Sequence, residues 1–135
     1  MTVQVVPFVD HGKTQQSAND DGPKLALSTD AQATGLGELA ADAPGGRLFI
    51  AVFAGAKRTG GFAIEVKRVA REGDRLEIHA RFAEPGKNAL VTQVLTSPAQ
   101  LVSIDRREAS GVRAAILTDS SGVERAHVAV RQSEL

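Results

Sequence analysis

The sequence predicts a β-rich α+β domain of mostly antiparallel strands with one short helix. Apolar and polar residues alternate in residues 62–69 and 76–82, which is typical of strands with one buried face. Residues 48–53 are apolar throughout, which favours a central strand covered on both sides. Only residues 28–41 place apolar residues at helical spacing. The chain has 135 residues, so we expect one domain covering residues 1–135 with its own core.

The N-terminal part predicts two strands separated by a long loop. Residues 3–9 and 24–27 are short apolar runs, and we interpret both as strands. Residues 10–23 are polar and contain Gly, Asn, Asp and Pro, so a flexible loop is expected there.

The helix is predicted to begin at residues 28–30, where Ser, Thr or Asp can cap it, and to end near residue 41. Gly35 and Gly37 oppose it, because each glycine costs up to about 1 kcal/mol inside a helix. The apolar positions of this helix are Ala33, Leu36, Leu39 and Ala40.

Two hairpins are predicted in the remainder of the chain. The first turns at residues 72–74, and a slip in its alternation indicates a bulge near residues 67–68. Residues 85–88 form a further turn and residues 101–104 a further strand. The second hairpin is expected to span residues 112–130. In all, about seven or eight strands are predicted by these patterns.

The composition excludes several classes of function. Sixteen basic and sixteen acidic residues give a net charge of zero, which argues against nucleic acid as a partner and against a polybasic membrane patch. No stretch is long and apolar enough to predict membrane insertion. The chain has no Cys, so neither a disulfide nor a thiolate metal site is expected. Five Phe are the only aromatic residues, which disfavours stacking on single strands.

No catalytic motif can be assembled from the sequence. Walker A, dinucleotide-binding and G-x-S-x-G patterns are all missing. His11, His79 and His127 lack metal-ligand spacing and are interpreted as solvated, although the last two could meet across neighbouring strands. Residues 20–22 and 119–122 contain Asp and Gly but not the calcium-loop pattern, so we interpret both as turns. We therefore expect no enzyme activity, no cofactor and no metal.

Two short segments stand out from this background. The first is Thr59-Gly60-Gly61-Phe62-Ala63-Ile64, a Gly pair between two apolar runs. The second, after Pro85-Gly86, is Val91-Thr92-Gln93-Val94-Leu95-Thr96-Ser97-Pro98. Together they resemble the C-terminal domain family of PrcB, a protease-complex-associated protein. That family has a T-G-G-Y/F-x-I turn followed by P-G and V-T-Q-x-L-T-x-P. Arg58 and Ala99 depart from it, since the family often has Pro and an aromatic residue at these places.

Each segment has a structural and a functional interpretation. The Gly pair is most simply a tight turn, and the alternatives are an anion-binding nest or a loop that contacts a partner. The hydroxyls and amide of the second segment either satisfy buried backbone groups or line a cleft beside the turn. The predicted partner-binding residues are Lys57, Arg58, Thr59, Gly60, Gly61, Phe62, Thr92, Gln93, Thr96, Ser97 and Pro98.

The resemblance covers residues 48–106 and implies a bacterial, non-enzymatic accessory domain that assists assembly or stability of a protease complex. The alternative is a small β-sandwich protease inhibitor, because residues 58–62 are similar to the T-T-G-Y/F loop of chagasin-like inhibitors. As written, the chain has no signal peptide and would be cytoplasmic. The resemblance implies export instead, with a signal peptide removed.

Overall fold

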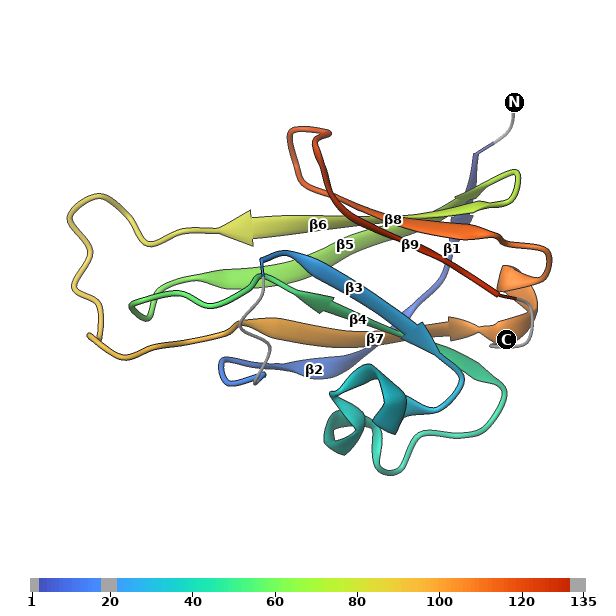
Figure 1. Ribbon diagram of the computed structural model, residues 1–135, viewed down its shortest axis with the longest axis horizontal. Coiled ribbons are helices and arrows are strands. Elements are labelled where there is room, and N and C mark those ends of the chain that lie inside the picture. Colours follow the sequence, from blue (N-terminus) through green and yellow to red (C-terminus); the bar gives the residue numbers. More distant parts are fainter. Residues whose placement is uncertain (1–2, 18–21, 132–135) are drawn as a thin grey trace.

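Two β-sheets packed face to face make up the fold (Figure 1). The structure is a computed structural model that describes residues 3–17 and 22–131. The described strands are β1 (Gln4–Val6), β2 (Val9–Thr14), β3 (Lys24–Ser28), β4 (Arg47–Phe53), β5 (Ala63–Glu72), β6 (Arg75–Ala83), β7 (Ala99–Asp105), β8 (Ala114–Thr118) and β9 (Glu124–Ala129). One sheet has the order β1-β5-β6-β8-β9 and the other the order β2-β7-β4-β3.

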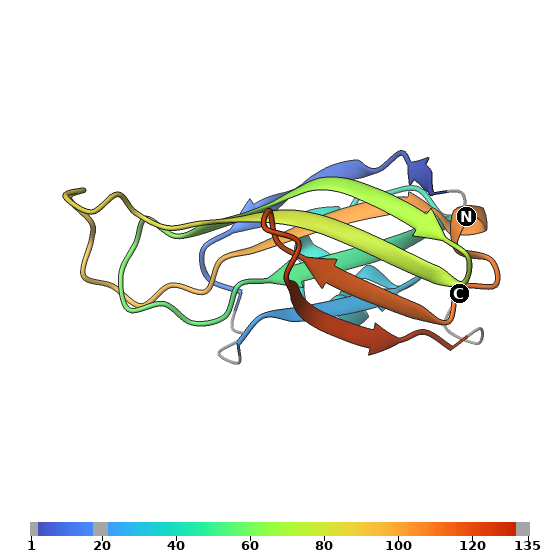
Figure 2. The same ribbon diagram turned by 90° about the horizontal axis from the view of Figure 1, so that it is seen from above.

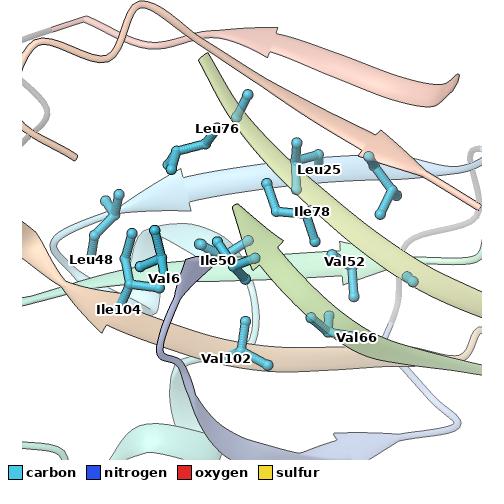
Figure 3. Close-up of a cluster of buried hydrophobic side chains, with 14 of the residues drawn as sticks. Val6, Leu25, Leu48, Ile50, Val52, Val66, Leu76, Ile78, Val102 and Ile104 are labelled. Atoms are coloured by element: carbon cyan, nitrogen blue, oxygen red, sulfur yellow. The ribbon is translucent and has the colours of Figure 1, made fainter. Parts of the chain in front are cut away.

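Strand β4 is the centre of the packing, as its apolar sequence predicts. Ile50 and Val52 are fully buried between the two sheets, where they meet side chains from both (Figure 3). Phe49 and Phe53 point to the opposite face and belong to a second apolar cluster. Because strand side chains alternate between faces, an all-apolar strand needs a cover on each side.

The second cover comes from residues 31–40, where the predicted helix proves wrong. The chain forms two 3-10 turns instead, η1 (Ala31–Thr34) and η2 (Gly37–Ala40). Asp30 does cap the first turn, since its carboxylate accepts from Gln32 N at 3.0 Å. Gly35 then takes a left-handed φ of 89°, which stops helical winding and turns buried Leu36 onto the outer face of β4.

The fold class is accordingly β-rich, with no α-helix among residues 3–17 and 22–131. The predicted α+β class overstated the helical part of the chain. It rested on the spacing of Leu36, Leu39 and Ala40, which do pack on the second cluster, but from η2 and the residue just before it instead of from an α-helix.

The N-terminal strand and loop also differ from expectation. The run predicted as one strand is divided at Pro7, so that β1 and β2 join different sheets. Proline has no N–H to donate to a sheet, which makes it a natural crossing point. Residues 10–14, predicted as loop, extend β2, and residues 18–21 of that loop lie outside the described part of the chain.

The first predicted hairpin is confirmed as β5 and β6, including its bulge. The pairing shifts between Val66 and Arg68, and Gly73 takes a φ of 61° in the turn. At the bulge, Val66 N donates at 2.6 Å to the side-chain oxygen of Gln100, a buried residue of β7 in the other sheet. This hydrogen bond ties the two sheets together where the ladder is irregular.

The second predicted hairpin is confirmed as β8 and β9. Strands β8 and β6 pair in parallel, and every other neighbouring pair is antiparallel. The parallel pair arises because the chain visits the other sheet as β7 between β6 and β8. Hydrophobic periodicity reports which face of a strand is buried and carries no information on which strand lies beside it.

Candidate protein-contact site

Both conspicuous sequence segments lie in loops that cross from one sheet to the other. Residues 54–62 lead from β4 to β5, and residues 84–98 lead from β6 to β7. The two loops run out together beyond the same end of the sandwich, away from the chain ends (Figure 1, left). Figure 2 shows the same projection from above. We call residues 54–62 and 84–98 the tip.

Hydrogen bonds fasten the two loops of the tip to each other. Lys57 N donates to Thr96 O at 2.7 Å, and Thr96 N donates to Lys57 O at 2.9 Å. Farther out, Gly60 N donates to Thr92 O at 3.0 Å. The Thr96 hydroxyl adds a bond of 2.9 Å to Thr59 O. The two segments singled out from sequence therefore form one structural unit.

The Gly pair is required by the closeness of this contact. A Cβ on Gly60 would lie 2.6 Å from the Thr92 hydroxyl oxygen. Gly61 has a φ of 91°, and a Cβ there would lie 2.7 Å from Pro85 Cβ. Because the Gly60 N–H already donates to Thr92, it is not available to an anion. The structure thus favours the turn interpretation over the nest.

The predicted contact residues differ in exposure and fall into buried, half-buried and exposed groups. Thr96, Ser97 and Pro98 are buried, and the Ser97 N–H donates to Gln15 O at 2.7 Å. These three residues therefore serve the fold, as the structural interpretation of the second segment predicts. Gly60 is also buried; Lys57, Thr59 and Phe62 are half-buried; and Arg58, Gly61, Thr92 and Gln93 are exposed.

Sequence reasoning missed the most exposed apolar side chains of the tip. Leu90 is 103% exposed, Leu95 73% and Val94 53%. Loop backbone at Leu95 is held in place, since Gln16 Nε2 donates to Leu95 O at 3.1 Å. One signal in the sequence could have found them. Apolar residues occur between Gly86 and Pro98 without the alternation of a strand, and this pattern predicts a loop that carries apolar side chains.

A small cleft of about 150 Å³ lies between the base of the tip and the β8–β9 turn. Two Phe side chains line it, each with a cation over its ring. Lys57 Nζ lies 5.2 Å from the ring centre of Phe62, and the Arg125 guanidinium lies 4.5 Å from that of Phe82. Arg125 is also paired with Asp119 at 3.0 Å. The cations cover aromatic surface that would otherwise face water.

His11 is not the solvated loop residue that the sequence predicts. It lies on β2, with its Nε2 atom 2.7 Å from the hydroxyl oxygen of Ser103. Arg47 Nε donates to the same oxygen at 3.0 Å. Burial, with a smaller contribution from Arg47, lowers the pKa of His11. A Ser–His pair is the usual arrangement of an activated nucleophile, but this Ser hydroxyl belongs to a fully buried residue within a strand.

His79 and His127 do not meet across neighbouring strands. His79 on β6 pairs with Thr118 of β8, and His127 on β9 pairs with Ile116 of the same strand, so β8 lies between them. Within the described ranges, no group of three His, Cys, Asp or Glu residues could hold a metal ion.

The Asp119 segment forms the predicted turn. Gly122 N donates to Asp119 O at 3.0 Å, and Ser121 N donates to the Asp119 carboxylate at 2.9 Å. Asp20 and Asp21, in the other predicted turn, lie outside the described residues.

Residues 48–105 match a known family, described as PrcB C-terminal. This match confirms the resemblance to the PrcB C-terminal family that the two sequence segments predict. The PrcB segment extends from the second residue of β4 to the last residue of β7, so it contains both loops of the tip. No curated protein and no solved structure matches the chain. Of the helical turns in the described residues, none is long and apolar enough to cross a membrane.

Proposed function

We propose that this chain is a non-enzymatic, protein-binding accessory domain that assists the assembly or stability of a protease complex. The tip is its contact surface. The observation that carries this proposal is that the PrcB segment holds both crossing loops, and that these loops present Leu90, Val94 and Leu95 to solvent on a hydrogen-bonded support.

The exposed apolar side chains supply a reason to bind. Burying a fully exposed Leu side chain contributes about 1.5–3 kcal/mol. Leu90 and Leu95 lie five positions apart on one loop and could enter one apolar pocket of a partner or two neighbouring pockets. A cluster of exposed apolar side chains on a projection is typical of an interaction site.

The hydrogen bonds of the tip lower the cost of binding. A loop that must become ordered on binding loses conformational entropy, and this loss subtracts from affinity. Here the bonds from Lys57 to Thr96 and from Gly60 to Thr92 hold the loop before any partner arrives. Exposed Arg58, in the other loop of the tip, adds a positive charge, which favours a partner with an acidic rim.

A protease inhibitor remains a second candidate, because the projecting loop of residues 84–98 on a β-sandwich has a form that a protease cleft can accept. The two functions make opposite predictions in a protease assay. An inhibitor lowers turnover when added at one equivalent, whereas an accessory domain leaves turnover unchanged or prolongs it by stabilising the complex.

The proposal is tested by isolating the partner and then altering the tip. Tagged protein is used to capture partners from cells of the source organism, and binding of the captured protein is measured at two salt concentrations. Arg58→Glu should weaken binding most at low salt, while the melting temperature stays nearly unchanged, because exposed charges add little stability. Arg81→Glu, on an exposed residue of β6, is the matched control.

Catalysis is tested separately with esterase, protease, phosphatase and glycosidase substrates. We expect no turnover. An activity that survives repurification and is abolished by one point mutation would rule out the non-enzymatic part of the proposal.

A further inference from the structure

A larger cleft, of about 810 Å³, lies between the start of β4 and η3 (Arg106–Ala109). Strand β4 leaves this end of the sandwich and reaches the tip at the other, so the two sites are separate. The cleft is lined by three arginines, Arg47, Arg106 and Arg107, by one carboxylate, Asp105, and by Gly45, Gly46 and Ser110. In a chain without net charge, arginines outnumber carboxylates in this lining.

Arg47 is held in a fixed orientation. Its Nε donates to the Ser103 hydroxyl at 3.0 Å, and its Nη2 donates to Ser103 O at 2.8 Å. Since Ser103 is fully buried in β7, the guanidinium plane is anchored to the core of the fold. The other N–H groups of this anchored guanidinium are held in place, so they lose little freedom when they bind an oxyanion.

The cleft already accommodates one carboxylate. Arg107 Nη2 donates to Asp105 Oδ2 at 2.8 Å, and Arg107 Nε donates to Asp105 Oδ1 at 3.2 Å. The Arg107 side-chain and backbone hydrogen bonds, with a smaller contribution from Arg47, lower the pKa of Asp105 to about 2. The Arg107 side chain is nevertheless 90% exposed, so its other guanidinium N–H donors can reach a ligand from solvent.

A second cleft, of about 300 Å³, adjoins the first and shares Arg47 and Asp105 with it. Its apolar walls are Pro7, Phe8 and Val9, from the end of β1 to the start of β2. The combined lining offers a cationic part and an apolar part that meet at Arg47.

Carboxylates in the combined lining select the ligand further. Asp105 and Glu108 line it beside the arginines. They repel a phosphate dianion more than a monoanion, and guanidinium groups bind carboxylates through paired N–H donors.

We propose that this double cleft binds a carboxylate carried on an apolar body, with the carboxylate against Arg47 and Arg107 and the body against Phe8 and Val9. The ligand is either the free C-terminus of an apolar peptide or a small hydrophobic carboxylic acid. Both ligands present a carboxylate on an apolar body. The peptide can make further contacts through the rest of its chain.

The test is titration of the isotope-labelled protein, followed by NMR, with four probes. They are hexanoate, a short Leu-rich peptide with a free C-terminus, the same peptide as a C-terminal amide, and inorganic phosphate. We expect the peptide acid to shift the amide signals of Gly45, Gly46 and Ser110. The amide form should bind about tenfold more weakly, since it cannot make charge-assisted hydrogen bonds. Stronger binding by the peptide acid than by hexanoate identifies a peptide terminus as the source, and equal binding identifies a small acid.

Two variants locate the site. Arg107→Gln and Arg47→Gln should each weaken binding of the peptide acid about tenfold or more, and Arg81→Gln, at an exposed position of β6, should leave its affinity unchanged. Arg107 is exposed, so its variant keeps the test valid if loss of Arg47 disturbs folding. Equal binding of acid and amide, binding of phosphate as tight as that of hexanoate, or no binding at all would each overturn the proposal.

Discussion

Gly61 lies where the two loops of the tip leave no room for a side chain. Its left-handed φ is unfavourable for any residue with a Cβ, and the space a Cβ would need is occupied by Pro85. Gly60 faces the second constraint alone, since its added Cβ would meet Thr92. The Gly pair is therefore explained by the packing of the tip, independently of any partner.

Substitution of these glycines should lower stability. Gly61→Ala is expected to cost about 1 kcal/mol or more, from backbone strain together with the clash at Pro85. Gly60→Ala should cost less, because the Thr92 hydroxyl can rotate away. Gly86→Ala, in the same loops and without a positive φ or a close contact, is the matched control. Urea unfolding measures all three, and equal stability of the Gly61 and Gly86 variants would contradict this account.

His11 makes stability depend on pH. A neutral imidazole can accept the Ser103 proton, whereas a charged one would compete with Arg47 for the same oxygen. Burial, then Arg47, lowers the folded-state pKa of His11 below its ordinary value of 6.5. The unfolded chain thus binds more protons between the two pKa values. Stability is fully present above pH 6.5 and is lost as the pH falls toward the folded-state pKa.

The melting temperature of the wild type should therefore fall between about pH 7.5 and pH 5 more than that of His11→Gln. His127→Gln, on an exposed residue of β9, controls for loss of an imidazole. Asp105 and Glu65, whose pKa values lie at about 2, do not titrate in this window. The same pH dependence in the wild type and the His11 variant would contradict a lowered pKa of His11 in the folded state.

At the scale of elements, β4 and the bulge of β5 join the two sheets. Ile50 and Val52 fill the space between the sheets, while Phe49 and Phe53 need the 3-10 turns as cover. Because β4 is buried on both faces, water cannot fill the space that a smaller side chain on this strand would leave.

Ile50→Ala should destabilise the domain by about 2–5 kcal/mol, through lost transfer free energy and the cavity that remains. Denaturant unfolding with one cooperative transition is the measurement. A loss below about half a kcal/mol would mean that β4 is not central to the fold.

Gln100→Ala tests the link between the sheets at the bulge. Without the side-chain oxygen, the Val66 N–H loses its acceptor in a buried place, and we expect a cost of about 1–3 kcal/mol. Gln93→Ala, on an exposed residue of the tip, should change stability by less than about 0.5 kcal/mol. Equal costs for the two Gln variants would contradict the structural role assigned to Gln100.

For the whole molecule, local patterns predicted most strands. The features that they did not predict depend on contacts between residues far apart in the sequence. Alternation located β5, β6 and the bulge, because each residue there reports its own face. The helix failed because the preference of Gly35 for a left-handed φ outweighed helical spacing. The contact of His11 with Ser103 and the cleft at Arg47 join residues far apart in sequence, which no local pattern encodes.

The local motifs of the candidate site were predicted from the sequence, but the exposure of its apolar side chains was not. The Gly pair and the Thr92 segment are short motifs, and the structure brings them together. Exposure of Leu90 and Leu95 depends on how far the loops project from the sandwich, which follows from the crossing between sheets.

The most direct test of the central claim compares partner capture by the wild type and by a Leu90→Ser, Leu95→Ser variant. Both side chains are exposed, so the variant should melt within a few degrees of the wild type. We expect the wild type to enrich subunits of one protease complex, reproducibly and at stoichiometric amounts, and the variant to lose them. Val123→Ser, at an exposed apolar residue of the β8–β9 turn, should retain them. Equal capture by the wild type and the tip variant would contradict the assignment of the tip as the contact surface.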